Sequence, residues 1–177
     1  VIISTNMSNA NIFELDKLDQ PGTTTQGEKW SFFTDRVMGG LSKGQATVNT
    51  IDNTLCYQMT GNVTTENNGG FIQIRTNLSP LIKANEYEGV YIKIYGNNES
   101  YSLFLRTKLT LAPWQYYSYS FLAKNEWLEI RAPFKDFKKS NFYQLKKLSN
   151  QNIKSIGLVA AFDNFYADIC LAEIGLY

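Results

Sequence analysis

The chain has 177 residues, which is enough for one ordinary domain and too few for two. Lysine and arginine number 17 against 16 aspartate and glutamate residues, and the formal net charge of +1 argues against bulk electrostatic capture of nucleic acid. The sequence has no histidine, which excludes Ser-His-Asp and Cys-His catalysis and every metal site that needs an imidazole. We therefore expect a chain that is not an enzyme and that carries no cofactor and no metal centre.

Taken in chain order, the alternation of apolar and polar residues is that of β-strands almost throughout. We expect strands at 44–48, 55–59, 71–75, 90–95, 101–107, 116–123, 127–130, 156–161 and 169–176. The turn sequence Gly96-Asn97-Asn98 predicts that residues 90–107 form one hairpin. Short helices are expected at 11–15, 78–85 and 142–148. Strands at this spacing, broken by glycine and asparagine turns, predict an all-β antiparallel sandwich or barrel in a single domain spanning 1–177.

The two cysteines, Cys56 and Cys170, are too far apart in the sequence for CxxC chemistry and too few for a four-thiolate metal site. A disulfide between them stays open, but we expect two buried thiols because free cysteine is among the most buried residue types.

No run of about 20 apolar residues is present, so we expect a soluble chain without a transmembrane segment. The chain starts at Val rather than Met, so we expect a trimmed N-terminus, which leaves both a cytoplasmic location and export open.

Two segments combine paired glycines with apolar and polar neighbours, and we call them the Gly-Gly loops. The first runs from Trp30 to Ser42 and contains Gly39 and Gly40; a strand rather than a helix follows it, which disfavours a phosphate loop. The second, 60–71, offers oxygen ligands for calcium at Glu66, Asn67 and Asn68, but a bulged turn is favoured. Asp35 and Glu66 could serve as the two acids of a glycosidase, yet nothing in the sequence marks them as a pair.

Aromatic and arginine side chains share the outward positions of several predicted strands. Arg75 and Arg106 alternate with apolar residues, and Trp114 and Tyr116 lie in an aromatic-rich segment. Flat rings beside guanidinium groups are typical of a sugar site or a protein hot spot, although aromatic residues are favoured in strands in any case.

Residues 124–154 hold eight lysine and arginine residues against three acids. With the interleaved aromatics Phe134, Phe137, Phe142 and Tyr143, this stretch would suit RNA or an anionic membrane surface. We expect instead a solvated loop whose aromatics point inward, and nucleic acid is not an expected partner.

The motif Asp35-Arg36-Val37-Met38-Gly39-Gly40-Leu41-Ser42, followed by Asn68-Gly69-Gly70-Phe71, resembles the complex I intermediate-associated protein 30 family. The resemblance covers about 28–177 and extends to 127–137 and to the final strand. It implies a galactose-binding-domain-like β-sandwich, a jelly roll that also hosts many carbohydrate-binding modules. It also implies an assembly factor or chaperone, because mitochondrial members help to assemble respiratory complex I. No catalytic residue is carried over.

The leading interpretation is a binding module that recognises a protein partner, with a respiratory-complex subunit or assembly intermediate implied by the resemblance. In this interpretation the two Gly-Gly loops lie near each other and present Trp30 and Met38 to the partner. The alternative is a carbohydrate-binding module that uses the aromatic and arginine face of a sheet. The candidate ligand- or partner-binding residues are Trp30, Asp35, Met38, Gly39, Gly40, Asn68, Gly69, Gly70, Arg75, Arg106, Trp114 and Tyr116.

Overall fold

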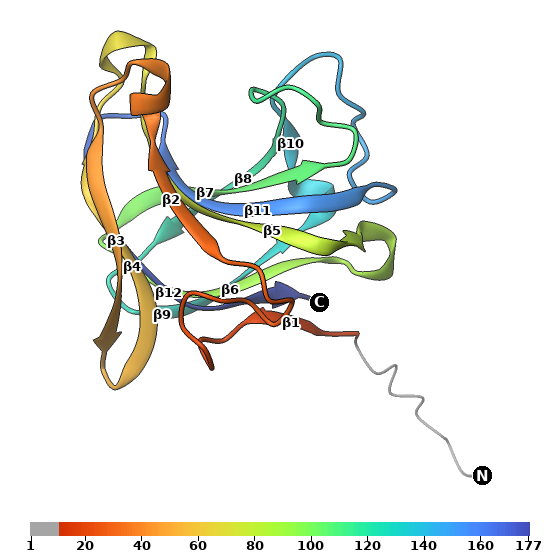
Figure 1. Cartoon of the computed structure of the whole chain (residues 1–177), viewed down its shortest axis with the longest axis horizontal. Coiled ribbons are helices and arrows are strands. Elements are labelled where there is room, and N and C mark those ends of the chain that lie inside the picture. The colour runs from red at the N-terminus through yellow and green to blue at the C-terminus, as the bar shows by residue number, and fades with distance from the viewer. Residues whose placement is uncertain (1–10) are drawn as a thin grey trace.

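A computed structural model describes residues 11–177 and shows two antiparallel six-stranded sheets packed face to face (Figure 1). The first sheet has the order β3-β4-β12-β6-β9, with β1 paired to β12. Its strands are β1 (Phe13–Asp16), β3 (Lys43–Ile51), β4 (Thr54–Val63), β6 (Gly89–Tyr95), β9 (Trp127–Pro133) and β12 (Phe165–Leu176). The expected all-β antiparallel sandwich is confirmed.

The second sheet has the order β10-β8-β7-β11-β5-β2 and carries the features that matter for function. Its strands are β2 (Trp30–Thr34), β5 (Phe71–Lys83), β7 (Glu99–Thr107), β8 (Tyr117–Ala123), β10 (Lys138–Lys139) and β11 (Asn152–Ala161). The long strands β5 and β7 both pair with the central strand β11. The connections that follow β2 and β4 at one end of this sheet, and those between β7 and β8 and between β10 and β11 at the other end, project beyond its outward side (Figure 1).

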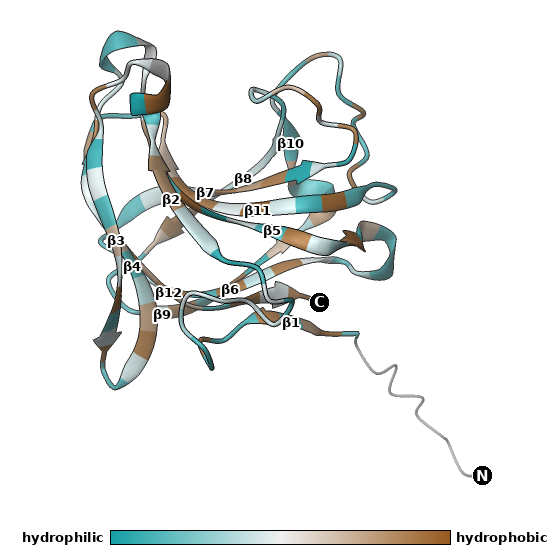
Figure 2. Cartoon of the chain, viewed as in Figure 1, coloured by the Kyte–Doolittle hydropathy of each residue, from teal (hydrophilic) through white to brown (hydrophobic). Residues whose placement is uncertain are grey.

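The core lies between the sheets and follows the two-residue period of the strands. In β7, Leu103 and Leu105 are fully buried, and the buried Ile72 and Ile74 of β5 lie on the same inner side of the second sheet. Apolar (brown) segments of both sheets meet in the interior (Figure 2). The alternate residues of β5 and β7 therefore point away from the core, as the sequence pattern predicts.

The predicted hairpin over 90–107 is wrong. Strand β6 pairs with β12 and β9 in the first sheet, whereas β7 pairs with β11 and β8 in the second. Short connections between alternating runs favour hairpins locally. Here Gly96-Asn97-Asn98 carries the chain across the sandwich, because each strand buries its apolar face better against the opposite sheet.

The three expected helices are also corrected. Residues 13–16 form β1, residues 78–83 complete β5, and 142–148 form a turn followed by irregular chain. Within residues 11–177 the only helical segments are four single 3-10 turns: η1 (Asp35–Met38), η2 (Glu66–Asn68), η3 (Ala84–Glu86) and η4 (Phe134–Asp136). β5 pairs with β11 through Asn77 and again at Ile82 and Lys83, so residues 78–81 around Pro80 form an irregular, extended bulge of the strand rather than a helix.

The expectation of two free thiols is wrong, because Cys56 and Cys170 form a disulfide with their Cα atoms 5.5 Å apart. Cys56 lies on β4 and Cys170 on β12, which are neighbours in the first sheet. Both cysteines are fully buried. Burial statistics suggested thiols, but strand pairing placed two residues 114 positions apart side by side.

Candidate functional site

The two Gly-Gly loops meet at a buried carboxylate. Asp35 has no exposed surface, and it accepts hydrogen bonds from the backbone N–H groups of Ser42 (3.0 Å), Gly70 (2.5 Å) and Phe71 (3.3 Å). The Ser42 hydroxyl donates to the same carboxylate and also accepts from the N–H of Thr64. Asp35 therefore joins the first Gly-Gly loop to the second.

The glycines of both loops are needed because they pack on this carboxylate. A Cβ atom at Gly40 would lie 2.4 Å from Asp35 Cγ, and one at Gly69 would lie 2.4 Å from Asp35 Oδ2. Gly39 differs, because a Cβ there would meet nothing within 4 Å; its φ of +86° is the left-handed conformation that ends η1. The paired-glycine motifs thus specify a rigid junction around Asp35.

The environment of Asp35 favours its ionised form. Burial raises the pKa of the carboxyl group, but the hydrogen bonds from Ser42, Gly70 and Phe71 outweigh this and hold the pKa below its ordinary value. Glu66, by contrast, lies exposed on η2. A fully hydrogen-bonded carboxylate without exposed surface is not placed to act with Glu66 on a substrate.

Trp30 lies away from this junction, contrary to the expectation that it stands beside the glycines. It is opposite Thr76 at the start of β2, whereas the junction follows the end of that strand. Its Nε1 donates to Asp16 (2.7 Å), and its ring packs 5.6 Å from that of Tyr57, whose hydroxyl donates to the same carboxylate. Trp30 therefore closes the edge of the core. The side chains of Met38 and Asn68 lie outside the described part of the structure.

The outward side of the second sheet gathers the polar and aromatic residues that the strand pattern singled out. We call it the open face, and its residues are Phe33, Gln73, Arg75, Ser102, Phe104, Arg106, Tyr116 and Ser155. Gly157 of β11 lies opposite both Arg75 and Phe104, and Ser155 lies opposite Arg106. Arg75 and Arg106 therefore flank one strand with an offset of two residues, which places their Cα atoms about 12 Å apart.

Both arginines are half-buried and rest on aromatic rings. The Arg75 guanidinium lies 4.6 Å from the centre of the Phe33 ring, and that of Arg106 lies 5.8 Å from the ring of Tyr116. Tyr116 is itself stacked on Phe104, with ring centres 4.0 Å apart. Because Phe104 is buried beneath it, Tyr116 is the half-buried ring of this stack that lies beside the cations.

Neither guanidinium has an acidic partner. The ion pairs among residues 11–177 involve only Lys17 and Arg131, and residues 1–10 contain no Asp or Glu. Burial, together with the charge of Arg75, lowers the pKa of Arg106 to about 10, which leaves the group protonated at neutral pH. The open face thus carries two uncompensated positive charges.

A hollow of about 400 Å³ lies between these arginines and the connection 110–113. Arg75, Arg106 and Lys154 contribute to its lining, and no acidic residue does. Among the described residues, Arg106 Nη1 and the Oγ of the buried Ser155 have no hydrogen-bond partner. The lining suits a ligand group that accepts hydrogen bonds and carries negative charge.

Trp114 lies on the connection that borders the hollow but does not line it. Its side chain is 65% exposed, and the neighbouring Pro113 carbonyl accepts from Arg106 Nη2 at 3.4 Å. Of the four residues predicted for an aromatic and arginine face, the structure therefore brings Arg75, Arg106 and Tyr116 together and leaves Trp114 at the rim.

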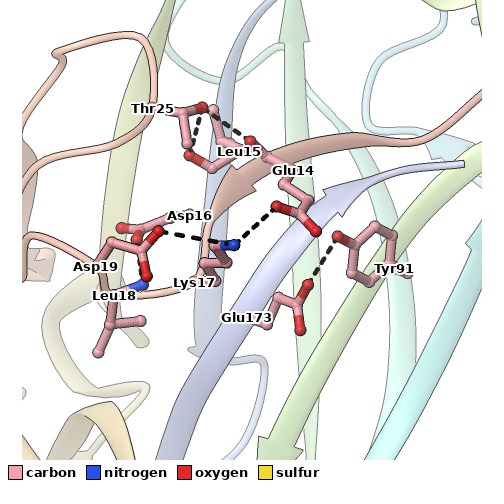
Figure 3. A network of polar contacts seen from close by, with 9 residues as sticks. All are labelled: Glu14, Leu15, Asp16, Lys17, Leu18, Asp19, Thr25, Tyr91 and Glu173. Carbon is pink, nitrogen blue, oxygen red and sulfur yellow. Dashed lines mark hydrogen bonds and ion pairs between the residues drawn. The ribbon is translucent and has the colours of Figure 1, made fainter.

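A second hollow, of about 440 Å³, lies on the outward side of the first sheet and was not predicted. Glu14, Tyr91 and Glu173 face one another there, and the Tyr91 hydroxyl donates to Glu173 at 3.0 Å (Figure 3). Lys17 lies between Glu14 (3.3 Å) and Asp19 (3.7 Å). The alternation of Tyr91 and Lys93 with apolar residues in β6 indicated a polar outward side in the sequence. The carboxylates of Glu14 and Glu173, however, already have polar partners within the chain. We therefore take the open face as the candidate site.

The lysine-rich stretch is divided between inward and outward aromatics. Phe134 and Phe137 are buried, as expected, but Phe142 and Tyr143 are 85% and 86% exposed, contrary to the expectation. No group of three or more acidic or cysteine side chains within residues 11–177 is placed to hold a metal ion.

Residues 18–172 match the sequence model of the family described as Complex I intermediate-associated protein 30. The chain belongs to this family. The match confirms the resemblance carried by the Gly-Gly loops, and it includes the Asp35 junction and both arginines of the open face. No curated protein is similar enough in sequence to count as a relative.

Several solved structures that are similar to this family member are carbohydrate-binding modules. The family 11 module of the cellulosomal cellulase Lic26A-Cel5E of Clostridium thermocellum has a TM-score of 0.72 at 17% identity, over 96% of this chain and 95% of that one. The same module in complex with a β-1,3-1,4-mixed-linked tetrasaccharide has a TM-score of 0.70 at 17% identity, over 96% of each chain. A family 30 module has a TM-score of 0.55 at 13% identity, over 78% and 91%. These likenesses show the jelly-roll fold.

No helix among residues 11–177 is long and apolar enough to cross a membrane.

Proposed function

We propose that this chain is a non-catalytic recognition domain that binds an acidic region of a partner protein on its open face. The observation that carries the proposal is the pair of half-buried arginines, Arg75 and Arg106, without an acidic partner in the chain. Membership of the Complex I intermediate-associated protein 30 family supports a protein as the ligand. By analogy, the partner is a subunit or assembly intermediate of a respiratory complex.

The physical reason is the cost of removing a charge from water. A guanidinium that loses part of its hydration without gaining a counter-ion destabilises the free protein, and a partner carboxylate recovers that cost on binding. Arginine is enriched at protein-binding hot spots because its planar fork bonds a carboxylate at two points and stacks on rings. Arg75 on Phe33 and Arg106 beside Tyr116 have this arrangement.

Site-specific photo-crosslinking tests the proposal. A photoreactive phenylalanine analogue replaces Phe162, which is 61% exposed with its ring 6.0 Å from that of Phe104. The matched position is Tyr166, an aromatic residue of β12 in the first sheet that is 55% exposed. We expect one defined protein to crosslink from position 162 and not from 166, and Arg75→Gln with Arg106→Gln to abolish the crosslink. Equal crosslinking from both positions would contradict the proposal. So would a crosslink from position 162 that remains when both arginines are replaced, or the absence of any crosslink from that position.

A second candidate function is carbohydrate binding, and one observation favours it. The half-buried Tyr116 ring, which is stacked on the buried Phe104, lies beside hydrogen-bond donors, as aromatic rings do in sugar sites. The jelly-roll fold shared with carbohydrate-binding modules over almost the whole chain agrees with this. Titration with a mixed-linked β-glucan tetrasaccharide, followed by tryptophan fluorescence, distinguishes the two functions. Saturable binding that Tyr116→Ala removes would favour the carbohydrate, and no response to this or any other saccharide of a glycan array at millimolar concentrations would exclude it.

A further inference from the structure

Two connections at one end of the second sheet present large apolar side chains to solvent. They are 108–116, between β7 and β8, and 140–151, between β10 and β11, and we call them together the loop tip. Its exposed apolar residues are Leu109, Leu111, Trp114, Phe142, Tyr143 and Leu145, with exposed fractions from 58% to 86%. Apolar segments are visible along both connections above β8 and β11 (Figure 2). An exposed group of this size marks an interaction surface.

The loop tip is held in this form by polar contacts that join its two connections to each other and to β8. The Ser140 hydroxyl donates to the Trp114 carbonyl at 2.7 Å, and Gln144 Nε2 donates to the Tyr116 carbonyl at 2.9 Å. Gln151, which is buried, donates to the Tyr117 hydroxyl at 2.8 Å and to the Lys147 carbonyl at 2.9 Å. Because the backbone is anchored from below, the outward position of the apolar side chains is part of the fold.

The charge of the loop tip has one sign. The loop tip and the residues that flank it, 108–117 and 138–154 together, contain no Asp or Glu, and the six lysines of this stretch are Lys108, Lys138, Lys139, Lys146, Lys147 and Lys154. All but Lys154 are exposed. The ammonium group of Lys139 lies 5.4 Å from the centre of the Phe142 ring. Cations therefore surround the apolar side chains, although the whole chain has a net charge of only +1.

We propose that the loop tip binds the surface of a lipid bilayer that contains anionic headgroups. Phe142, Tyr143 and Trp114 would enter the interfacial layer, where aromatic side chains are favoured, and the lysines would lie over the headgroup phosphates and carboxylates. Leu111 and Lys154 also line the arginine-bearing hollow, whereas Phe142, Tyr143 and Lys146 do not, so a bound bilayer would lie beside the open face.

Three features favour a bilayer over nucleic acid or an acidic protein. Exposed Leu109, Leu111 and Leu145 gain nothing from stacked bases but gain from an apolar interface. The cations are lysines, which attract diffuse negative charge, rather than arginines, which grip one carboxylate or phosphate at two points. The connections stand above the sheet (Figure 1), and such a projection enters a soft interface more readily than a rigid protein groove.

The test is co-sedimentation of the full chain with vesicles of phosphatidylcholine alone or with about one-third phosphatidylserine. We expect binding to the anionic vesicles at about 0.1 M salt, and loss of binding as the salt concentration rises. Lys146→Gln with Lys147→Gln should weaken binding about 25-fold, roughly fivefold for each lysine. Phe142→Ser with Tyr143→Ser should weaken it at least tenfold and make the remaining binding more sensitive to salt.

Matched controls use residues of equal type elsewhere. Val48→Ser with Leu55→Ser removes two exposed apolar side chains on β3 and β4, and Lys29→Gln with Lys43→Gln removes two exposed cations. Both controls should bind vesicles as the unaltered chain does. Wild-type binding by either loop-tip variant, or no preference for anionic vesicles, would overturn the proposal. Binding of poly(U) or polyglutamate without binding of vesicles would also overturn it and would assign the loop tip to nucleic acid or protein.

Discussion

Replacing Asp35 should destabilise the whole domain. In Asp35→Ala the buried N–H groups of Ser42 and Gly70 lose their acceptor, and the partly buried N–H of Phe71 loses its own. Each unsatisfied buried donor costs about 1–3 kcal/mol, so we expect the free energy of unfolding to fall by about 3–5 kcal/mol. This is a large part of the 5–15 kcal/mol that is typical of a domain.

Asp35→Asn preserves the shape and removes the charge. A single amide oxygen replaces a carboxylate that serves four donors from three residues, and we expect a loss of about 2–3 kcal/mol at pH 7. The pKa of Asp35 is lower in the folded state than its ordinary value of 3.8. The stability contributed by ionised Asp35 is therefore complete above about pH 4 and is lost as the pH falls through the folded-state pKa. The difference between the unaltered chain and Asp35→Asn should shrink accordingly.

Urea unfolding followed by tryptophan fluorescence at pH 7 and below pH 3 measures both effects. Glu126→Gln is the matched control, because it makes the same acid-to-amide change at an exposed position, and it should leave the midpoint at pH 7 unchanged. Equal stability of Asp35→Asn and the unaltered chain at pH 7 would refute the role of Asp35 as the junction. So would a deficit that stayed the same at low pH.

Three further changes test separate parts of the structure. Gly69→Ala should cost more stability than Gly39→Ala, because the new Cβ at Gly69 would meet the Asp35 carboxylate, whereas Gly39→Ala introduces only backbone strain of about 1 kcal/mol. Thermal melting of the two variants measures the difference. Equal losses would contradict the packing of Gly69 on the carboxylate. Cys56→Ser with Cys170→Ser should lower the free energy of unfolding by about 2–5 kcal/mol. Titration of free thiols in the unaltered chain, after unfolding without a reducing agent, should detect none. Arg106→Met should leave the melting temperature unchanged or raise it while ligand binding falls, because it removes a half-buried, unpaired charge; a clear loss of stability would show that the guanidinium serves the fold.

Periodicity alone predicted much of the open face. The two-residue alternation in 71–75 and 101–107 placed Arg75 and Arg106 outward and the branched apolar residues inward, because a strand that borders one core must alternate. The meeting of the two arginines depends on β11, which inserts between β5 and β7 from a distant part of the sequence. No local pattern encodes which strand lies between two others.

The Gly-Gly loops carry the motifs that indicated the family, but only the structure shows why those glycines are required. The sequence indicated that these glycines are special and that the loops lie near each other. It did not show that Asp35 is the reason, because the acceptor and its donors at Gly70 and Phe71 are about 35 positions apart. Trp30 was misplaced for the opposite reason: it is close to Asp35 in the sequence, but an extended strand separates them in space.

The sequence by itself determined the fold class, the outward and inward sides of the strands and the chemistry that the absence of histidine excludes, since all of these follow from local residue type and period. Tertiary structure decided the disulfide, the split of β6 and β7 between sheets, and the outward aromatics of the loop tip. Each of these depends on pairing between distant segments, where the burial of a whole apolar face outweighs the preference of a short turn or a single side chain.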